Sequence, residues 1–505
     1  MYSKAFWAAR VDRRYWRQSV LLAAAFFAVC LAIFRARSQS ITVDEASTYF
    51  WWVSGTAYYP WSPSSNNHVL NSMLMWISTH AFGTSILTVR APALLGAILY
   101  VLICLFLCRS ITDRFSLQFP VFICLVYNPF ILDFMVAGRG YSLANAFLLT
   151  AIAIPVWHQR TAGASLRKSC AVASLALGLS FAANFSFAFV AMAVFIAIAA
   201  WALKRRGNDS AIRILCFCVL PGLVTALLIC GYPLAHMSRD ELWYGAHSLR
   251  EMSQSVIEPS LHQLNPRFQG SRWFKAINFL KLFLLPVLGI LCICQLFVSK
   301  LDGSRFSGSR ERWLEKFTAA LAAIATLTVL LHWLAFRFAS LPLPKGRTGI
   351  FLLPLLTLIA TAIAASPAHS GVSKWLRRAT TTALFCVAGY FLLCLRVSYF
   401  EEYQWDADVK DVYGVLAGLN HASGVTDVAV NWMYHAPLDF YRVISNKETF
   451  PEFTLFVEEP PPPGKPVYVL RAGYHQPFID KEKLRVIYHG KSTEVVVAVR
   501  PAADP

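Results

Sequence analysis

The chain has 505 residues, of which 56% are hydrophobic and 15% are charged, and its formal net charge is +18. About a quarter of the residues in a soluble globular protein are charged, so this composition excludes that class. Residues 1–400 hold 36 basic and 13 acidic residues, whereas the rest of the chain holds 10 basic and 15 acidic ones. The positive excess therefore belongs to the apolar part of the chain and does not indicate nucleic-acid binding.

Apolar runs of about twenty residues recur along the first four fifths of the chain, and each is long enough to cross the ~30 Å hydrocarbon layer as a helix. The sequence therefore predicts an all-α polytopic membrane protein. The first run has no small-residue cleavage site, which indicates an anchor and not a signal peptide. We expect eleven spans, at residues 19–36, 90–109, 115–135, 142–158, 169–187, 188–203, 211–233, 277–298, 317–336, 349–366 and 379–396.

Basic residues gather before the first span and in alternate linkers, which predicts that these segments are cytoplasmic. An odd number of spans then places the tail after residue 400, and the loop after the first span, on the outer side. All twelve cysteines fall in predicted spans, so the outer segments offer no disulfide framework or zinc cluster. The basic linker residues include Arg109, Arg114, Arg160, Arg167, Lys168, Lys204, Arg205, Arg206, Arg213, Lys374, Arg377 and Arg378.

We expect two domains. Residues 1–399 form a membrane domain with long outer loops at 38–89 and 234–276, and the first loop holds a short surface helix near 69–82. Residues 400–505 form a small extramembrane α/β domain. Its helices are expected at 407–420 and 437–445, and its strands at 426–432, 465–471, 483–490 and 493–500.

The stretch "ITVDEASTYFWW" (41–52) places two adjacent carboxylates, Asp44 and Glu45, shortly after the first span. One interpretation is an ordinary helix start, with Thr42 or Asp44 as the cap and acids in the first turn. The alternative is a catalytic carboxylate beside the membrane, which could accept the proton of an attacking hydroxyl.

Positive and polar side chains are predicted at the same outer face. Arginine at a helix end often extends to lipid headgroups. Here, however, several basic residues lie on the outer side, although basic residues are usually enriched on the cytoplasmic side, and they lie near one carboxylate pair. Arginines at such a place could neutralise a leaving phosphate, and adjacent glycines would let an anion approach the backbone. These residues are Asn67 and His68 in "NNHVLN", Arg90, Arg139 and Tyr141 in "AGRGYS", and Lys345 and Arg347 in "LPLPKGRTG".

These motifs resemble those of membrane-embedded glycosyltransferases of the GT-C type, in particular the branch of protein O-mannosyltransferases and lipid A aminoarabinose transferases. The resemblance rests on "DEAST", "NNHVLN", "FGTSILTVRAPALLG" (82–96), "NPFILDFMVAGRGYSLANAFLL" (128–149) and "GRTGIFLLPLLTL" (346–358). The resemblance is clear over the first ~160 residues, and in the later spans it rests mostly on the general pattern of the sequence.

The resemblance implies an inverting transferase that uses a polyprenyl-phosphate sugar at the outer face of a bacterial inner membrane. The acceptor would be a glycan, a lipid or a protein. By this resemblance Asp44 is the candidate base, and Glu45 supports it or positions the acceptor. Arg139, Arg347, Lys345 and Tyr141 are candidates for the donor phosphate, and His68, Asn67 and Arg90 for substrate binding.

Some related enzymes use a divalent metal. Asp240 and Glu241 in the second outer loop could supply oxygen ligands, although a solvated loop or helix turn is the favoured interpretation of these acids. Two other functions stay open: a transporter or flippase for a lipid-linked sugar, and an inactive relative that serves as a scaffold. A transporter would place ionisable groups near the membrane midplane, whereas here they gather at outer helix ends.

Overall fold

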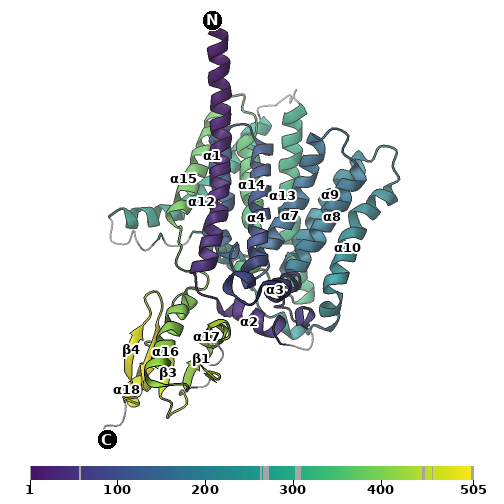
Figure 1. Ribbon diagram of the computed structural model, residues 1–505. Coiled ribbons are helices and arrows are strands. Elements are labelled where there is room, and N and C mark those ends of the chain that lie inside the picture. Colours follow the sequence, from purple (N-terminus) through teal and green to yellow (C-terminus); the bar gives the residue numbers. More distant parts are fainter. Residues whose placement is uncertain are drawn as a thin grey trace.

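Long helices lie side by side in the computed structural model, and a small α/β part lies beyond one end of them (Figure 1). The structure describes residues 2–55, 59–261, 264–265, 272–301, 309–445, 450–457 and 459–501. The N-terminus lies at the opposite end of the bundle from the α/β part (Figure 1).

Among the described residues, nine helices are long and apolar enough to cross a membrane. A chain with this many such helices is an integral membrane protein. The nine are α1 (Tyr2–Ser38), α4 (Ile86–Ile111), α7 (Tyr141–Arg160), α8 (Leu166–Ala183), α9 (Ala188–Arg205), α10 (Ala211–His236), α12 (Arg272–Leu301), α13 (Ser309–Ala339) and α14 (Leu352–Ala365).

Two of the eleven predicted spans differ from these nine, so the count of eleven is not confirmed. Helix α5 (Phe115–Val126) is apolar but has only 12 residues, which at 1.5 Å per residue reach about 18 Å. Helix α15 (Gly371–Leu393) is long, but its first half carries Lys374, Arg377 and Arg378.

Asparagines explain where two predicted spans begin or end. The predicted span 115–135 is not one helix, because Asn128 caps the separate short helix α6 (Pro129–Phe134) and its side chain accepts from the backbone N–H of Phe130. The predicted break near residue 187 is confirmed: α8 ends at Ala183, and Asn184 caps the single turn η2 (Phe185–Phe187) before α9.

Short helices gather at the end of the bundle nearest the α/β part. The predicted surface helix is α3 (Val69–Phe82), which Figure 1 shows nearly end-on and therefore crosswise to the long helices. Helix α2 (Val43–Trp52) lies beside it (Figure 1). Further short elements are η1 (Tyr59–Trp61), η3 (Arg239–Glu241), α11 (Leu249–Ser260), η5 (Gly346–Gly349) and η6 (Gln404–Asp406).

The C-terminal part has the predicted α/β alternation around a five-stranded mixed sheet of order β2-β1-β3-β5-β4. Strand β1 pairs in parallel with β2 and β3, and β5 runs antiparallel to β3 and β4. The three-residue strand β2 and the helix α18 were not predicted. The elements are α16 (Val409–Ser423), β1 (Val428–Asn431), α17 (Trp432–Ser445), β2 (Thr454–Phe456), β3 (Val467–Arg471), α18 (Gln476–Lys481), β4 (Arg485–His489) and β5 (Val495–Val499).

The sheet shares one hydrophobic cluster with helices α2 and α3 of the membrane part. Tyr49 of α2 packs edge-on against Phe440 of α17, with ring centroids 5.4 Å apart. The hydroxyl of Tyr441 accepts a hydrogen bond from the backbone N–H of Ile41 at 3.1 Å. The same cluster includes Met75 and buried residues of β1 and β3. The α/β part is therefore docked on α2 through packed side chains.

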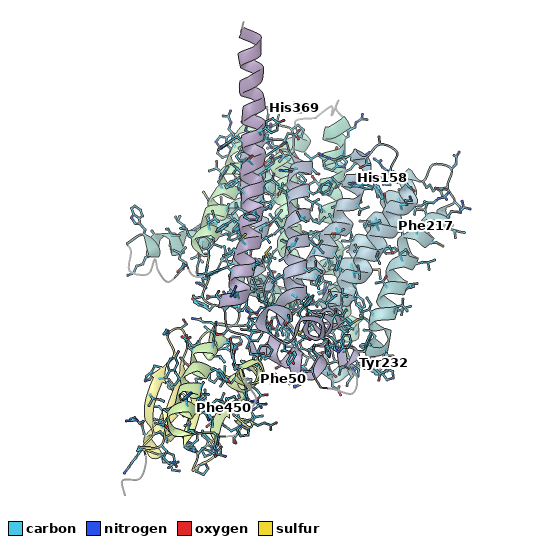
Figure 2. The ribbon with its side chains drawn as sticks, in the orientation of Figure 1. Phe50, His158, Phe217, Tyr232, His369 and Phe450 are labelled. Atoms are coloured by element: carbon cyan, nitrogen blue, oxygen red, sulfur yellow. The ribbon has the colours of Figure 1, made fainter. Side chains whose placement is uncertain are left out.

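The arrangement generates a topology prediction. Figure 2 places His158 and His369 toward the end of the bundle where the N-terminus lies, and Phe50 and Tyr232 at the other end. A reporter fused at Gly163, in the linker after α7, should therefore show cytoplasmic activity, and a reporter at Gly424, after α16, should show outer-face activity. Equal sidedness of the two fusions would contradict both the span arrangement and the placement of the site described below.

Candidate active site

Helix α2 begins without help from Asp44. The side chain of Thr42 accepts from the backbone N–H of Glu45, and the Glu45 carboxylate accepts from the backbone N–H of Thr42 at 2.9 Å. This reciprocal capping box satisfies the helix start. Of the two caps that the sequence allowed, the structure therefore uses Thr42, and the Asp44 carboxylate is available for other contacts.

Glu45 and Arg90 form a fully buried ion pair. Arg90 donates from Nε to Glu45 Oε1 at 2.8 Å and from Nη2 to Oε2 at 2.7 Å, and neither side chain is exposed. The backbone N–H of Gly138 also donates to Glu45 Oε1 at 2.7 Å. The other guanidinium hydrogens of Arg90 are donated to backbone carbonyls at the end of α1, those of Ala36, Gln39 and Ser40. Both side chains are thus fully occupied by the protein itself.

Asp44 faces away from this pair, because successive helix residues are rotated by about 100°. Its Oδ2 accepts from Arg347 Nη1 at 2.6 Å and from the Tyr403 hydroxyl at 3.0 Å, and Arg139 Nε lies 3.8 Å away. The Asp44 side chain is 21% exposed. Burial by itself would raise the pKa of Asp44, but Arg139, Arg347 and Tyr403 outweigh it and hold this pKa below its usual value.

The two arginines come from helix junctions far apart in sequence. Arg139 precedes α7 and is 1% exposed, and it donates to Thr48 Oγ1 at 2.7 Å and to Asn66 Oδ1. Its buried Nε has no hydrogen-bond partner among the described residues. Arg347 lies in η5 and is 19% exposed, and it also donates to the Tyr403 hydroxyl at 2.7 Å. One carboxylate thus lies between two guanidinium groups.

The glycines beside Arg139 allow close packing of the backbone. A Cβ on Gly140 would lie 2.3 Å from the carbonyl oxygen of Ala183, and the φ of +69° favours glycine. Gly138 lies against Val89 and Glu45. These glycines let the turn that carries Arg139 fit tightly against α4 and α8.

His68, Tyr141 and Asn67 lie close behind this cluster. His68 and Tyr141 are buried with ring centroids 5.1 Å apart. Burial, helped by the charges of Arg139 and Arg347, holds the pKa of His68 well below its usual value, so the imidazole is neutral at pH 7. Asn67 is buried and donates to the carbonyls of Pro60 and Ser62, which fixes the turn before α3.

Lys345 lies apart from this group of contacts. Its ammonium pairs with Glu251 of α11 at 2.9 Å, and both side chains are partly exposed. The pair links η5 to α11 beside Arg347, and it satisfies the lysine without any contact to Asp44.

Glu241 of the second loop is bound to the turn before α3. Glu241 Oε2 accepts from the Ser64 hydroxyl and from the backbone N–H of Ser65, each at 2.8 Å. Asp240 is exposed at the start of η3. Across the part of the chain that the structure describes, no three His, Cys, Asp or Glu side chains converge in a metal-binding arrangement. The geometry thus favours the solvated turn for these two acids.

Sequence reasoning missed Tyr403 and Glu402. Both follow the last long helix in "FEEYQW" (400–405), an acidic and aromatic run like that around Asp44. This likeness is the sequence feature that could have marked them as site residues. Asp133, which pairs with buried Arg35, accepts from the backbone N–H of Glu401 at 2.9 Å and thereby positions the segment.

Glu402 and Tyr403 are both shifted toward their protonated forms. Burial, assisted by the negative charges of Asp133 and Asp44 and opposed by Arg347, raises the pKa of Glu402 to about 7. Burial also raises the pKa of Tyr403 well above its usual value, so its hydroxyl keeps its proton. A second carboxyl group near Arg347 therefore titrates close to neutral pH.

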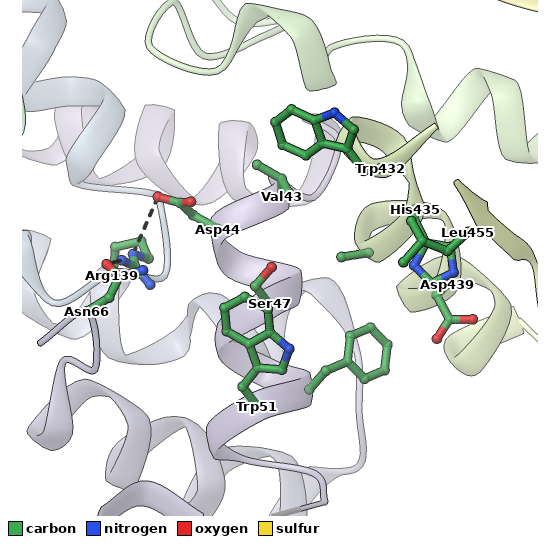
Figure 3. A pocket seen from close by; sticks show the side chains of 12 residues that line it. Val43, Asp44, Ser47, Trp51, Asn66, Arg139, Trp432, His435, Asp439 and Leu455 are labelled. Atoms are coloured by element: carbon green, nitrogen blue, oxygen red, sulfur yellow. Dashed lines mark hydrogen bonds and ion pairs between the residues drawn. The ribbon is translucent and has the colours of Figure 1, made fainter. Parts of the chain in front are cut away.

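A cavity of about 570 Å³ opens beside Asp44. Figure 3 shows Asp44, Ser47 and Trp51 of α2 on one side, with Arg139 and Asn66 beside Asp44, and Trp432, His435 and Asp439 of α17 on the other side. Asp44 is thus reachable from a space that lies between the membrane part and the α/β part.

Comparison with solved structures identifies the fold. ArnT from Cupriavidus metallidurans in the apo state matches with a TM-score of 0.51 at 12% identity, covering 98% of this chain and 100% of that chain. This chain has the fold of ArnT. The resemblance to GT-C glycosyltransferases predicted from the sequence is thereby confirmed at the level of the fold.

Two further structures match with lower TM-scores. ArnT bound to undecaprenyl phosphate gives a TM-score of 0.49 at 12% identity over 96% of this chain and 99% of that one. The Archaeoglobus fulgidus oligosaccharyltransferase gives 0.41 at 13% identity over 84% of this chain and 63% of that one. No family model and no curated protein matches the chain. At such low identity the ArnT likeness establishes the fold, and the activity has to be argued from the site.

The Glu45–Arg90 pair generates a stability prediction. Glu45→Gln keeps the shape of the side chain but leaves the Arg90 charge buried without a counterion, which typically costs about 3–5 kcal/mol. We expect a marked drop in the unfolding temperature of the detergent-solubilised protein. Glu251→Gln, in the exposed pair with Lys345, is the matched control and should change it little. Equal unfolding temperatures for the two variants would contradict the structural role of Glu45.

Proposed function

We propose that this chain transfers a glycosyl group from a polyprenyl-phosphate-linked sugar to an acceptor at the outer face of a bacterial inner membrane, with inversion at the sugar. The observation that carries this proposal is the Asp44 carboxylate, held between Arg347 and Arg139 at one end of the helix bundle and open to a cavity. The N-terminus would be cytoplasmic, and the α/β part would lie outside.

The arginines suit the donor phosphate. Two guanidinium groups face one carboxylate, so the cluster keeps a positive charge that attracts an anion. Arg139 Nε has a hydrogen to donate, and partly exposed Arg347 is reachable. A phosphate bound here would be stabilised as it takes on the leaving negative charge. Buried Tyr141 and His68 support the arginines from behind, whereas Lys345 could reach the donor only by leaving Glu251.

Asp44 suits the role of general base. In an inverting displacement the acceptor oxygen forms a bond to the anomeric carbon while the bond from that carbon to the phosphate oxygen breaks. The proton of the acceptor hydroxyl passes to Asp44, and the electron pair of the broken bond leaves with the phosphate. Arg347 and Arg139 lower the pKa of Asp44 in the free protein. A bound phosphate would screen these charges and so make the carboxylate a stronger base.

We also propose that residues 1–399 are the catalytic membrane domain and residues 400–505 a small outer domain. Tyr403, from the start of the second segment, donates to Asp44 in the first, and the charge of Arg347 acts on the pKa of the adjacent Glu402. The α/β part would therefore contribute to the catalytic site directly.

Transport is not favoured by this geometry. The charged side chains around Asp44 are carried by α2, the turn before α7 and η5, and Figure 1 shows α2 at one end of the bundle. A carrier would need its ionisable groups near the midplane.

Asp44→Asn tests the base. The amide keeps the shape of the side chain and removes the proton acceptor, and general-base catalysis contributes roughly 10²–10⁴ in rate. Transfer from a polyprenyl-phosphate sugar in proteoliposomes should therefore nearly vanish, while binding of the polyprenyl phosphate persists. Turnover close to that of the unmodified protein would exclude Asp44 as the base.

Arg139→Ala and Arg347→Ala test the phosphate contacts. Loss of a charge-assisted hydrogen bond costs about 1.5–3 kcal/mol, which corresponds to roughly ten- to a hundredfold in donor affinity or transfer rate. Arg250→Ala is the control, because Arg250 is exposed on α11. If all three variants bind polyprenyl phosphate equally, the two arginines have only a structural role.

Glu402 generates a pH prediction. With its pKa at about 7, Glu402 is mostly neutral at pH 6 and mostly ionised at pH 8. The negative charge that appears would partly cancel that of Arg347 and weaken binding of a phosphate. Glu402→Gln should therefore bind polyprenyl phosphate severalfold more tightly than the unmodified protein at pH 8 and about equally at pH 6. The affinity of both proteins for polyprenyl phosphate is measured by titration in nanodiscs at the two pH values. If the affinity of the unmodified protein and that of Glu402→Gln change with pH in the same way, this link is refuted.

A further inference from the structure

The cavity beside Asp44 has two tryptophan walls that come from different parts of the chain. Trp51 of α2 is 56% exposed and Trp432 of α17 is 52% exposed, and both line the cavity. Figure 3 shows the two rings on either side of Ser47 and Asp44. Large apolar rings left this open at a cavity next to a reactive carboxylate are suited to contact a ligand.

The helices that carry these walls are packed against each other, so the backbone of the cleft is formed before any ligand binds. The other face of α17 is packed into the core: Leu438 and Phe440 are fully buried, and Tyr441 is bonded to the backbone of Ile41. The packing that fixes α17 on α2 therefore leaves Trp432, His435 and Asp439 facing the cavity. A preformed cleft spares the ligand the entropy cost of ordering its walls.

The polar groups of the cleft are few and fixed. His435 Nε2 donates to the carbonyl of Phe453 at 3.3 Å, and Asp439 pairs with Arg442 at 2.5 Å. Ser47 adds a hydroxyl between the two tryptophans. The C–H face of a sugar ring packs on the electron-rich face of an aromatic ring, and its hydroxyls pair with such short polar side chains. The cavity of about 570 Å³ lies within the range of sites for ligands of this size.

We propose that this cleft is the acceptor site and that it binds a carbohydrate, with sugar rings against Trp432 and Trp51 and the attacking hydroxyl directed at Asp44. This inference rests on the proposed function and deepens it by choosing a glycan from among the three acceptor classes. It also gives the α/β part a definite role, because the acceptor would be held between that part and the membrane part.

The experiment measures binding of the full-length detergent-solubilised protein to an array of bacterial oligosaccharides and, in parallel, to an array of unglycosylated peptides. We expect the unmodified protein to bind a subset of the oligosaccharides. Trp432→Ala should weaken this binding at least tenfold, which corresponds to about 1.4 kcal/mol, and Trp432→Phe should retain most of it. Tyr474→Ala is the control, since Tyr474 is 64% exposed in the same part of the chain and does not line the cleft.

Several outcomes would overturn the inference: no oligosaccharide bound by the unmodified protein, equal binding by Trp432→Ala, or Trp432-dependent binding of peptides only. Polyprenyl phosphate binding in nanodiscs, measured on the same variants, separates this inference from the proposed function. Loss of oligosaccharide binding in Trp432→Ala with unchanged polyprenyl phosphate binding supports the cleft. If the unmodified protein binds oligosaccharides but no polyprenyl phosphate, the proposed function fails and the carbohydrate cleft stands.

Discussion

The buried ion pair between Glu45 and Arg90 holds helix α2, which carries Asp44, in its place beside the site. Through it α2 is tied to α4, to the carbonyls at the end of α1 and to the turn at Gly138. A buried ion pair is stable only when its remaining hydrogen-bonding groups are also satisfied, and here backbone groups satisfy them. Because Glu45 is fixed in this way, the neighbouring Asp44 is held in one direction, toward Arg347 and Tyr403.

A second buried pair, Arg35 with Asp133, does the same for the segment after the last long helix. The two pairs meet at Phe400, whose ring lies 5.5 Å from the Arg35 guanidinium carbon and 5.1 Å from that of Arg90. Phe400 directly precedes the segment that carries Tyr403. Cations stacked on one aromatic ring thus couple the membrane helices to the start of the α/β part.

The charged residues of the site form one buried pair and one partly exposed pair. Glu45 and Arg90 are sealed and satisfied, whereas Asp44 and Arg347 are about one fifth exposed and lie at the edge of a cavity. Because Asp44 is partly exposed, its arginine partners can bind a phosphate without leaving the carboxylate as an isolated buried charge. The buried pair Glu45–Arg90 fixes the position of α2, and the accessible pair Asp44–Arg347 is available to a substrate. This difference in role matches the different environments of the two adjacent acids.

The sequence by itself determined the elements whose signal is local. The length of the apolar runs predicted the long helices, and the alternation of apolar and polar residues predicted four of the five strands. Short sequence motifs pointed to Asp44, Arg139 and Arg347, which the structure brings together. The division of labour between Asp44 and Glu45 was decided only by tertiary structure, because it depends on which arginine each carboxylate meets, 45 or 303 residues away. Tyr403 and the cleft at Trp432 were also decided there, since both arise where the chain returns to α2 after some 360 residues or more, and local periodicity carries no information about contacts so distant in sequence.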